Sequence, residues 1–585
     1  MSDKTTTAVD PCCGTAEAAA RADACCDPNA RIEAAVGGAG CCGATAGSAQ
    51  PVEITTDHAG AGNGCCGDTS ITAATVLAET APSAVPVRDK PTEPVVVVGA
   101  GPVGLAAAAH LHEQGLPFLV LEAGDSVAAS VRQWGHVALF SPWRYNIDAA
   151  ARRLLDAAGW AAPDDEALPT GAQLAEEYLQ PLAKLPAIAP YLRLGARVVA
   201  ISRVGVDRVR TAGRADLPFV VRLADGTELT AGAIIDASGT WRTPNSLGVN
   251  GLLAHGESDA GSLIAHALPD VLGADRDAHA GAHTVVVGAG HSAANTLLDL
   301  ARLAETTPGT RITWAVRGGS AQRAFGGGDA DELPARGALG SGLRALVDTG
   351  RIALVTGFGV HTVRRTGTGL ELTATDGRTV TADRVVAATG FRPDHSIASE
   401  LRLDLDPILG CTRTLADVID PNEHSCGTVP PHGHRELSHP EPGYYAVGMK
   451  SYGRAPTFLM ATGYEQVRSI AAALAGDIAA ADDVQLDLPE TGVCSSDLGA
   501  ENAARAVAAR FGLTPDVPGR LATATMALLP TAASTSDAVR AAAAQIGLDP
   551  DTALEITSLV EQPGALPTVA GLISLTPSAG GSCCS

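Results

Sequence analysis

One short pattern of residues, which the chain carries twice, constrains its fold more than any other feature of the sequence. In the first copy, the apolar run Val95–Val98 precedes the glycine-rich turn Gly99–Gly104, the apolar stretch Leu105–Leu111 and the run Phe118–Glu122. Short β-branched apolar runs are typical of buried parallel strands. The order is therefore strand, tight turn, helix and strand, with an acidic residue at the end. This context makes the glycine spacing typical of a dinucleotide-binding βαβ unit.

Each glycine of that spacing has its own physical role. Gly99 permits the tight turn, Gly101 lets the backbone approach a pyrophosphate, and Gly104 allows the helix to pack closely on the strand. The N-terminus of the helix offers free N–H groups and the positive end of the helix dipole to the phosphates. Glu122 is placed to accept hydrogen bonds from the ribose hydroxyls of an adenosine.

The second copy starts at Thr284–Val287 and continues with the turn Gly288–Ala293, a helical stretch Ala294–Leu303 and the strand Arg311–Arg317. It keeps two of the three glycines and has alanine in the third place, a replacement that the fingerprint allows. The repetition of the whole unit makes a merely tight turn between a strand and a helix a weak explanation for either copy.

The two copies end in opposite charges. The candidate residues of the second nucleotide site are Gly288, Gly290, Ser292 and Arg317. A guanidinium at the end of the strand favours the 2′-phosphate of NADPH over the free ribose of NADH. A solvated charge is the alternative for Arg317. An acid in the first site and a base in the second predict FAD in the first and NADPH in the second.

The rest of the chain follows the same plan twice. Two hairpins are expected, at 219–229 with the turn Asp225-Gly226 and at 370–380 with the turn Asp376-Gly377, and each leads into a strand that ends at a glycine, Gly239 or Gly390. We predict an α/β fold of two Rossmann-like domains with a disordered Cys-rich N-terminal tail and a small helical C-terminal region. The predicted parts are a low-complexity tail (1–92), the first part of the FAD-binding domain (93–245), the NADPH-binding domain (246–390), the return segment of the FAD-binding domain (391–485) and the helical region (486–585).

Together with Ala237–Trp241, Ala388–Asp394 and Tyr445–Lys450, these motifs resemble the flavoproteins that have two dinucleotide-binding domains. The chain is more similar to the flavin-containing monooxygenase branch of FAD/NAD(P)-binding oxidoreductases than to the disulfide reductases. The resemblance covers residues 94–480. It implies further cofactor-binding residues: Gly239, Gly390 and Gly448, and Arg132 and Trp134 where the chain of this family crosses near the flavin. For Arg132 and Trp134 an ordinary place in the core is the alternative.

One absence decides between the branches. Disulfide reductases of this kind carry a redox pair of cysteines on the helix after the first adenosine-binding strand, whereas here the stretch 126–135 has none. Oxygen then becomes the expected acceptor of the electrons. The segment Gly261–His266 differs by one residue from the F-x-G-x-x-x-H segment usual in flavin monooxygenases, and it lacks the leading Phe.

Ten of the thirteen cysteines form adjacent pairs. Adjacent cysteines are strained if they bond to each other and poorly spaced for zinc, but soft thiolates bind thiophilic ions such as trivalent arsenic. The pairs, and the segments 420–427 and 449–456, resemble flavoproteins of arsenic-resistance gene clusters. Compositional drift, or scavenging of oxidants or Cu(I), are the alternatives. The candidate metal ligands are Cys12, Cys13, Cys25, Cys26, Cys41, Cys42, Cys65, Cys66, Cys583 and Cys584, with Cys411 and Cys426 as residues that could present a metalloid to the flavin.

The net charge of −23 argues against nucleic acid or an anionic membrane as a partner. We find no apolar run of the ~18 residues that a membrane span needs and no secretory signal, so the expected location is the cytoplasm. The expected function is an NADPH-dependent FAD oxidoreductase of monooxygenase type in arsenic or metalloid detoxification, with the Cys pairs capturing the metalloid and a trivalent arsenical as a candidate substrate. A metalloid or thiol reductase that uses Cys583-Cys584 and a metalloid-binding chaperone are the alternatives, and a homodimer is left open.

Overall fold

The computed structural model describes residues 92–326, 333–421, 429–456, 458–486, 507–508, 510–514, 517–529 and 532–561. The expected tail before residue 92 lies outside this part of the chain, and so do Cys12, Cys13, Cys25, Cys26, Cys41, Cys42, Cys65, Cys66, Cys426, Cys583 and Cys584. No helix of the described part is both long enough and apolar enough to cross a bilayer.

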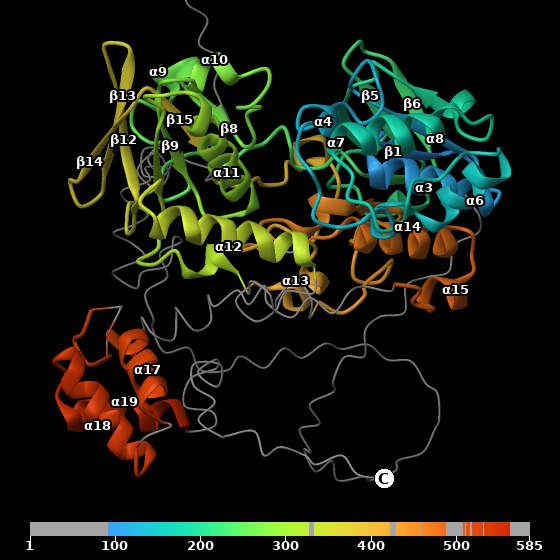
Figure 1. The fold of residues 1–585 in the computed structure, drawn as a ribbon. Coiled ribbons are helices and arrows are strands. Elements are labelled where there is room, and N and C mark those ends of the chain that lie inside the picture. The colour runs from blue at the N-terminus through green and yellow to red at the C-terminus, as the bar shows by residue number, and fades with distance from the viewer. Residues whose placement is uncertain are drawn as a thin grey trace, which may run out of the picture. The chain divides into compact units, whose positions relative to one another are not determined.

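The first sheet has five parallel strands in the order β16-β7-β1-β2-β3. Their bounds are β1 Val95–Val98, β2 Phe118–Leu121, β3 Leu192–Arg193, β7 Ala233–Asp236 and β16 Tyr444–Ala446. Helix α3 (Pro102–Glu113) and helix α14 (Met460–Leu474) pack against each other over this sheet, so the end of the described domain lies beside its beginning (Figure 1). The small side chains of α3 allow this close contact, because Leu105 to Ala109 are fully buried.

The second sheet repeats this arrangement with parallel strands in the order β11-β10-β9-β15-β8. Their bounds are β8 Ile264–His266, β9 His283–Val287, β10 Arg311–Ala315, β11 Ala353–Val355 and β15 Arg384–Ala387. Helices α11 (His291–Thr306) and α12 (Pro334–Asp348) pack beside each other in this domain (Figure 1). Two such sheets confirm the prediction of two Rossmann-like domains.

Both expected hairpins are present, each inside a three-stranded antiparallel sheet. The strands are β4 Val198–Arg203, β5 Phe219–Leu223 and β6 Glu228–Ala231 in the first, and β12 Val360–Thr366, β13 Gly369–Ala374 and β14 Thr379–Ala382 in the second. The turn glycine Gly226 has a φ of 88°, a left-handed conformation that favours glycine. The carboxylate of Asp225 accepts a hydrogen bond from the Thr227 N–H at 2.9 Å, which closes the turn.

The two crossover helices begin earlier than the apolar runs suggested, at Pro102 rather than Leu105 and at His291 rather than Ala294. The glycine turn is therefore very short, and helical backbone starts directly after Gly101 and Gly290. Proline is well suited to the first helical position because its missing N–H has no partner to lose there.

The C-terminal region contains the helices α17 (Val517–Leu528), α18 (Thr535–Ile546) and α19 (Pro550–Glu561), which share an apolar core. The last two were expected, whereas α17 was not, because Pro518 and Gly519 are signals that usually interrupt a helix. Both lie in its first turn, where they are tolerated. Most of the helix expected at 502–511 lies outside the described residues. The remaining short helices are α4 Ala129–Arg132, α5 Trp143–Asn146, α6 Ala149–Ala157, α7 Gly171–Gln173, α8 Gln180–Lys184, α9 Glu257–Ala260, α10 Arg276–His279, α13 Arg413–Ile419 and α15 Ile478–Asp482, with a π-helical segment at Leu174–Leu179.

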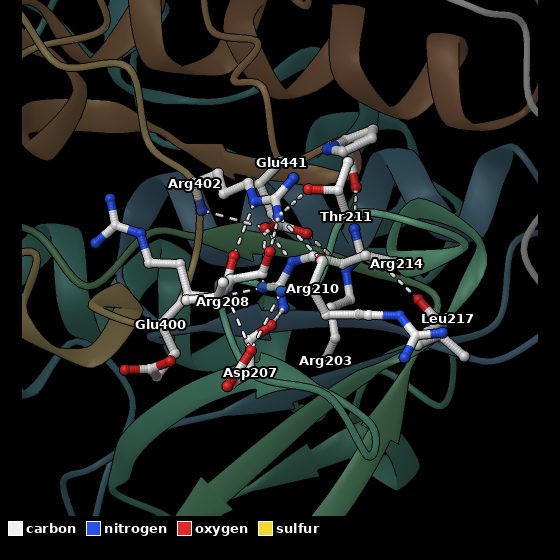
Figure 2. Close-up of polar contacts among 12 residues, drawn as sticks. Arg203, Asp207, Arg208, Arg210, Thr211, Arg214, Leu217, Glu400, Arg402 and Glu441 are labelled. Atoms are coloured by element: carbon white, nitrogen blue, oxygen red, sulfur yellow. Dashed lines mark hydrogen bonds and ion pairs between the residues drawn. The ribbon is translucent and has the colours of Figure 1, made fainter. Parts of the chain in front are cut away.

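A buried cluster of charges connects the β4–β6 sheet to the return segment of the chain (Figure 2). Glu441 accepts hydrogen bonds from Arg203 at 2.7 Å, from Arg214 at 3.1 Å and from the backbone N–H of Arg402 at 3.1 Å. The side chains of Arg203, Arg214 and Glu441 are at most 2% exposed. Burial by itself raises the pKa of Glu441, but these hydrogen bonds and the charge of Arg203 hold the pKa below its ordinary value.

The arginines of this cluster use their remaining donors on backbone carbonyls. Arg203 donates to the carbonyl oxygen of Pro442 at 2.6 Å, and Arg214 donates to that of Glu400 at 2.8 Å. The Arg402 side chain donates to the carbonyl oxygens of Arg208 and Arg210 at 3.0 and 2.9 Å. The cluster thus satisfies the loop after β4, which contributes few apolar contacts of its own.

We expect Glu441→Gln to destabilise the protein by about 3–5 kcal/mol, because it leaves two buried guanidinium groups without a carboxylate. The matched control is Glu228→Gln, which removes the partner of Arg222 in an ion pair whose side chains are 61% and 48% exposed. That variant should cost less than about 1 kcal/mol. Urea unfolding followed by circular dichroism measures both, and equal effects of the two substitutions would contradict the importance of the buried cluster.

Candidate functional site

The first glycine turn contains two positions where the fold itself requires glycine. Gly99 has a φ of 101°, and a Cβ placed there would lie 2.8 Å from the carbonyl oxygen of Ala237. A Cβ at Gly104 would lie 2.0 Å from the carbonyl oxygen of Gly99. These contacts are shorter than any real Cβ contact, so strand β1, helix α3 and the turn after β7 approach one another through glycine alone.

Gly101 differs from its two neighbours. Its φ of −81° is accessible to any residue, and a Cβ there would meet nothing within 4 Å. The fold therefore does not require glycine at this position, and the space above it is open. Gly101 is also the N-cap of α3, and no side chain caps this helix end. Open space above uncapped N–H groups at a helix N-terminus fits a pyrophosphate, as the sequence predicts for FAD.

Glu122 is held directly beside this turn. Its two carboxylate oxygens accept hydrogen bonds from the N–H groups of Ala100 at 2.8 Å and Gly124 at 2.7 Å, and the residue is 8% exposed. An ionised carboxylate has about four acceptor positions, so two remain for further donors. A fixed acceptor at the end of the second strand fits the ribose hydroxyls of an adenosine.

The second glycine turn has the same division of roles. Gly288 has a φ of 134°, and a Cβ there would lie 2.1 Å from the carbonyl oxygen of Ala388. A Cβ at Gly290 would meet nothing within 4 Å, and no side chain caps the N-terminus of α11 at this residue. Ser292 lies in the first turn of that helix. The arrangement again leaves room for a pyrophosphate at an uncapped helix end.

Arg317 follows β10 at the same edge of the sheet as the second glycine turn, since Ala315 pairs with Val287 immediately before Gly288. Its side chain is exposed and forms no ion pair with any residue that the structure describes. A solvent-facing guanidinium without a protein partner is consistent with a phosphate ligand, although the exposure alone also fits a solvated charge. The structure thus gathers Gly288, Gly290, Ser292 and Arg317 at one edge.

A buried ion pair at the carboxyl edge of the first sheet was not predicted. The ammonium of Lys450 lies 2.7 Å from the carboxylate of Asp236 and 3.1 Å from the hydroxyl of Ser238. The hydroxyl of Tyr444 donates to the same carboxylate at 2.9 Å. Lys450 is 1% exposed and Asp236 is fully buried. Burial raises the pKa of Asp236, but the attraction of Lys450 outweighs it and keeps the pKa below its ordinary value.

This pair stands next to the first glycine turn, because Asp236 pairs with Val98 and precedes the Ala237 carbonyl that contacts Gly99. The sequence contained a signal for it. An acid inside the otherwise apolar run Ala233-Ile-Ile-Asp236 has to find a cation when the strand is buried. Nothing local identifies Lys450 as that cation, which lies 214 residues away.

The other glycines expected at this site also lie at carboxyl ends of strands. Gly239 follows β7 with a φ of 68°, and Gly390 follows β15 with a φ of 84°. Gly448 follows β16 with a φ of 66°, and its N–H donates to the side-chain oxygen of Gln466 on α14 at 2.8 Å. All three are left-handed, so glycine is favoured by the backbone as well as by any ligand.

Arg132 and Trp134 are engaged within the first domain. Arg132 donates to the carbonyl oxygen of Val127 and forms an ion pair with Glu176. The ring of Trp134 packs on Gly171, where a Cβ would come within 2.6 Å of it. These contacts fix both side chains in position, and none of them is with a glycine turn.

Trp143, a candidate for a substrate pocket, is 2% exposed and belongs to the core of the first domain.

Cys411 is the one cysteine among the described residues, and it is fully buried. Burial, with a smaller contribution from nearby acids, raises the pKa of its thiol to about 12. His432 and His434 are buried too and are hydrogen-bonded to Gln466 and Ser469. Within the described ranges, no three or more His, Cys, Asp or Glu side chains are grouped so that they could hold a metal ion. The thiol of Cys411 is thus protonated and enclosed, which is unlike a metal ligand.

Two curated proteins of Arabidopsis thaliana share a short segment with this chain. They are named Probable indole-3-pyruvate monooxygenase YUCCA9 and YUCCA8, and they are 62% and 65% identical to it over 34 residues. That segment is 6% of this chain and 8% of each relative, so the chain spans a small part of the length of the curated relatives it matches.

Similar solved structures include the bacillithiol disulfide reductase Bdr (YpdA) of Bacillus cereus, with 21% identity and a TM-score of 0.49 over 66% of this chain and 98% of that one. A flavin monooxygenase of Stenotrophomonas maltophilia, solved as a double mutant, has 22% identity and a TM-score of 0.46 over 66% of this chain and 98% of that one.

A family model described as pyridine nucleotide-disulphide oxidoreductase matches residues 96–407, more than half of the 585 residues. The matched range begins in β1 and runs through both glycine turns to the strand β15 and beyond. It confirms the prediction of an oxidoreductase that uses FAD and NADPH. The two βαβ units, their open glycine turns and this match lead to one conclusion, that the chain belongs to the pyridine nucleotide-disulphide oxidoreductase family.

Proposed function

We propose that the chain is an NADPH-dependent FAD oxidoreductase of monooxygenase type that acts in the detoxification of arsenic or a related metalloid. The observation that carries the first half is the combination of two open glycine turns with the state of the only thiol that the structure describes. Cys411 is buried and its pKa is raised to about 12. A dithiol acceptor beside the flavin is thus not found in residues 92–326, and the two relatives named as monooxygenases support oxygen as the acceptor.

The residues of each site have separable tasks. Gly101 and Gly290 leave room for the pyrophosphates of FAD and NADPH, Glu122 holds the adenosine ribose of FAD, and Arg317 holds the 2′-phosphate of NADPH. Lys450 and Asp236 fix the turn after β7 without adding net charge beside it. When bound, FAD takes electrons from NADPH and passes them on to a second acceptor. The protein orients the two nucleotides and keeps water away from them.

The metalloid half of the proposal rests on the paired cysteines of the sequence. Two adjacent soft thiolates, with a third from another pair, suit a thiophilic ion such as trivalent arsenic. Three pairs of donors within the first 42 residues place several such sulfurs on one short segment. In this scheme the segment captures the metalloid and delivers it to the oxidoreductase, which leaves Cys411 without a role.

A reductase is the second candidate, and the family match favours it, since the family is described by its disulphide chemistry. The pair Cys583-Cys584 at the end of the sequence would then serve as the dithiol. A metalloid-binding chaperone whose flavin does not turn over is the third candidate.

We predict that Gly101→Ala lowers the affinity for FAD at least about tenfold, and that Gly290→Ala does the same for NADPH. Both methyl groups enter space that the fold leaves open, so neither variant should lose stability in thermal unfolding. Each variant is the control for the other site. Gly104→Ala is the contrasting variant, because its methyl group would overlap the Gly99 carbonyl and damage the turn itself. Full retention of flavin and of NADPH binding in Gly101→Ala and Gly290→Ala would remove these turns from the cofactor sites.

We predict that Arg317→Ser lowers the preference for NADPH over NADH, measured as the ratio of the two kcat/KM values, at least about tenfold. The loss of a guanidinium that pairs with the 2′-phosphate affects only the phosphorylated nucleotide. Arg311→Ser is the matched control, because Arg311 is an exposed arginine at the opposite end of the same strand. An unchanged ratio would identify Arg317 as a solvated charge.

The acceptor is tested by adding NADPH to the purified full-length protein without oxygen and then admitting oxygen, with and without trivalent arsenic. A monooxygenase should lose its flavin absorbance on addition of NADPH and regain it only with oxygen, and the double variant Cys583→Ser, Cys584→Ser should behave in the same way. Turnover of NADPH without oxygen that this double variant abolishes would establish the reductase. Arsenite binding without any oxidation of NADPH would establish the chaperone.

A further inference from the structure

A cavity of about 310 Å³ lies beside the crossings of the chain between the two sheets. Pro244 and Arg392 line it from the two crossings, and Leu253, Glu257, Ile264 and His266 line it from the second domain. No residue of either glycine turn contributes to it. Part of its wall is the segment 261–266, which departs from the usual monooxygenase motif. The cavity is therefore separate from the nucleotide positions described above.

The backbone of Arg392 is held firmly in place. Its N–H donates to the carbonyl oxygen of Thr243 at 3.1 Å, and the Thr243 hydroxyl donates to the carbonyl oxygen of Arg392. One residue away on each crossing, Pro244 and Phe391 form an antiparallel bridge. The two crossings thus support each other, so little backbone freedom remains to be lost when a ligand binds.

The guanidinium of Arg392 has no such support. The residue is half-buried at the cavity, and its side chain forms no hydrogen bond or ion pair with any residue in the described part of the chain. A partly desolvated cation without a counter-charge favours an anionic ligand. The planar fork of a guanidinium matches a carboxylate in particular, because it donates two parallel hydrogen bonds.

The other charged group at the cavity does not neutralise this cation. Both carboxylate oxygens of Glu257 accept backbone hydrogen bonds, from Leu247 at 3.0 Å and from Ala254 at 2.7 Å. The residue is 5% exposed, so its charge is stabilised by these peptide N–H groups. His266 is exposed at the same cavity and adds a second donor.

The remaining wall is apolar. Pro244, Leu253 and Ile264 line the cavity, and Leu253 is 63% exposed. An exposed leucine beside an unpaired arginine suits a ligand that has both an apolar body and an anionic end, because binding covers the one and pairs the other. A simple inorganic anion would use only half of this surface.

We propose that this cavity is a binding site for a small carboxylic acid, whose carboxylate pairs with Arg392 and whose apolar body covers Leu253 and Ile264. The site goes beyond the proposed function, since it shares no residue with the two nucleotide sites and its occupancy is measurable without turnover.

Isothermal titration of the full-length, FAD-loaded protein with benzoate tests the proposal. Benzoate should bind, while benzamide, which has the same shape without the charge, and acetate, which has the charge without the ring, should each bind at least about tenfold more weakly. Inorganic phosphate should also bind at least about tenfold more weakly. Arg392→Met should weaken benzoate at least about tenfold, and Arg392→Lys should restore only part of the loss.

Two comparisons keep the result interpretable. Arg364→Met, at an arginine of the same domain that is 62% exposed, should leave benzoate binding unchanged. The Arg392 variants should retain wild-type thermal unfolding and a dissociation constant for NADPH within twofold of wild type. Absence of benzoate binding, equal binding of phosphate, or no effect of Arg392→Met would overturn the proposal. Competition between benzoate and NADPH, with NADPH weakened in Arg392→Met, would do so as well by assigning Arg392 to the nucleotide site.

Discussion

The salt bridge between Lys450 and Asp236 holds together the part of the molecule on which the first site depends. Asp236 ends β7, the strand between β1 and β16, and Lys450 comes from the segment that returns after the whole second domain. A buried carboxylate on the central part of a sheet is costly unless a cation and hydrogen bonds meet it. The ammonium of Lys450 and the hydroxyls of Ser238 and Tyr444 supply both. Since Ala237 follows directly and touches Gly99, the position of the first glycine turn rests on this bridge. The Glu441 cluster performs the same task at a second point of contact between the return segment and the β4–β6 sheet.

The two glycine turns separate what the fold needs from what a ligand needs. Gly99, Gly104 and Gly288 are required by backbone contacts within the protein, because a Cβ at any of them would overlap a carbonyl oxygen. Gly101 and Gly290 are not required in this way, since each faces open space at an uncapped helix end. A glycine that the fold could replace by alanine needs another reason, and the approach of a pyrophosphate to the backbone supplies one. The identical division in both units supports two nucleotide sites of the same kind.

The family is described by its disulphide chemistry, yet the described thiol is unsuited to it. Cys411 is enclosed in the apolar core of the first domain, and a thiol with a pKa of about 12 is neither a nucleophile nor a metal ligand at neutral pH. The paired cysteines that could act lie in segments outside the described residues. The chemistry of this chain therefore depends on how those segments meet the oxidoreductase. The histidines of the loop before β16 are not available for a metal either, because His432 and His434 are hydrogen-bonded in the interior.

The sequence by itself determined the two βαβ units, both hairpins with their Asp-Gly turns, and the glycines and terminal charges of the two nucleotide sites. These features are local: β-branched runs, glycine spacing and turn residues act over a few positions, so each is visible in a short window. It did not reveal α17, because Pro518 and Gly519 interrupt the helical pattern although a first turn accepts them. Only the tertiary structure decided that Lys450 is the partner of Asp236, that Glu441 joins Arg203 to Arg214, and that Arg392 faces a cavity without a counter-charge. The physical reason is distance along the chain. A buried charge announces that it needs a partner, but which of many distant side chains reaches it depends on how the sheets and crossings are packed.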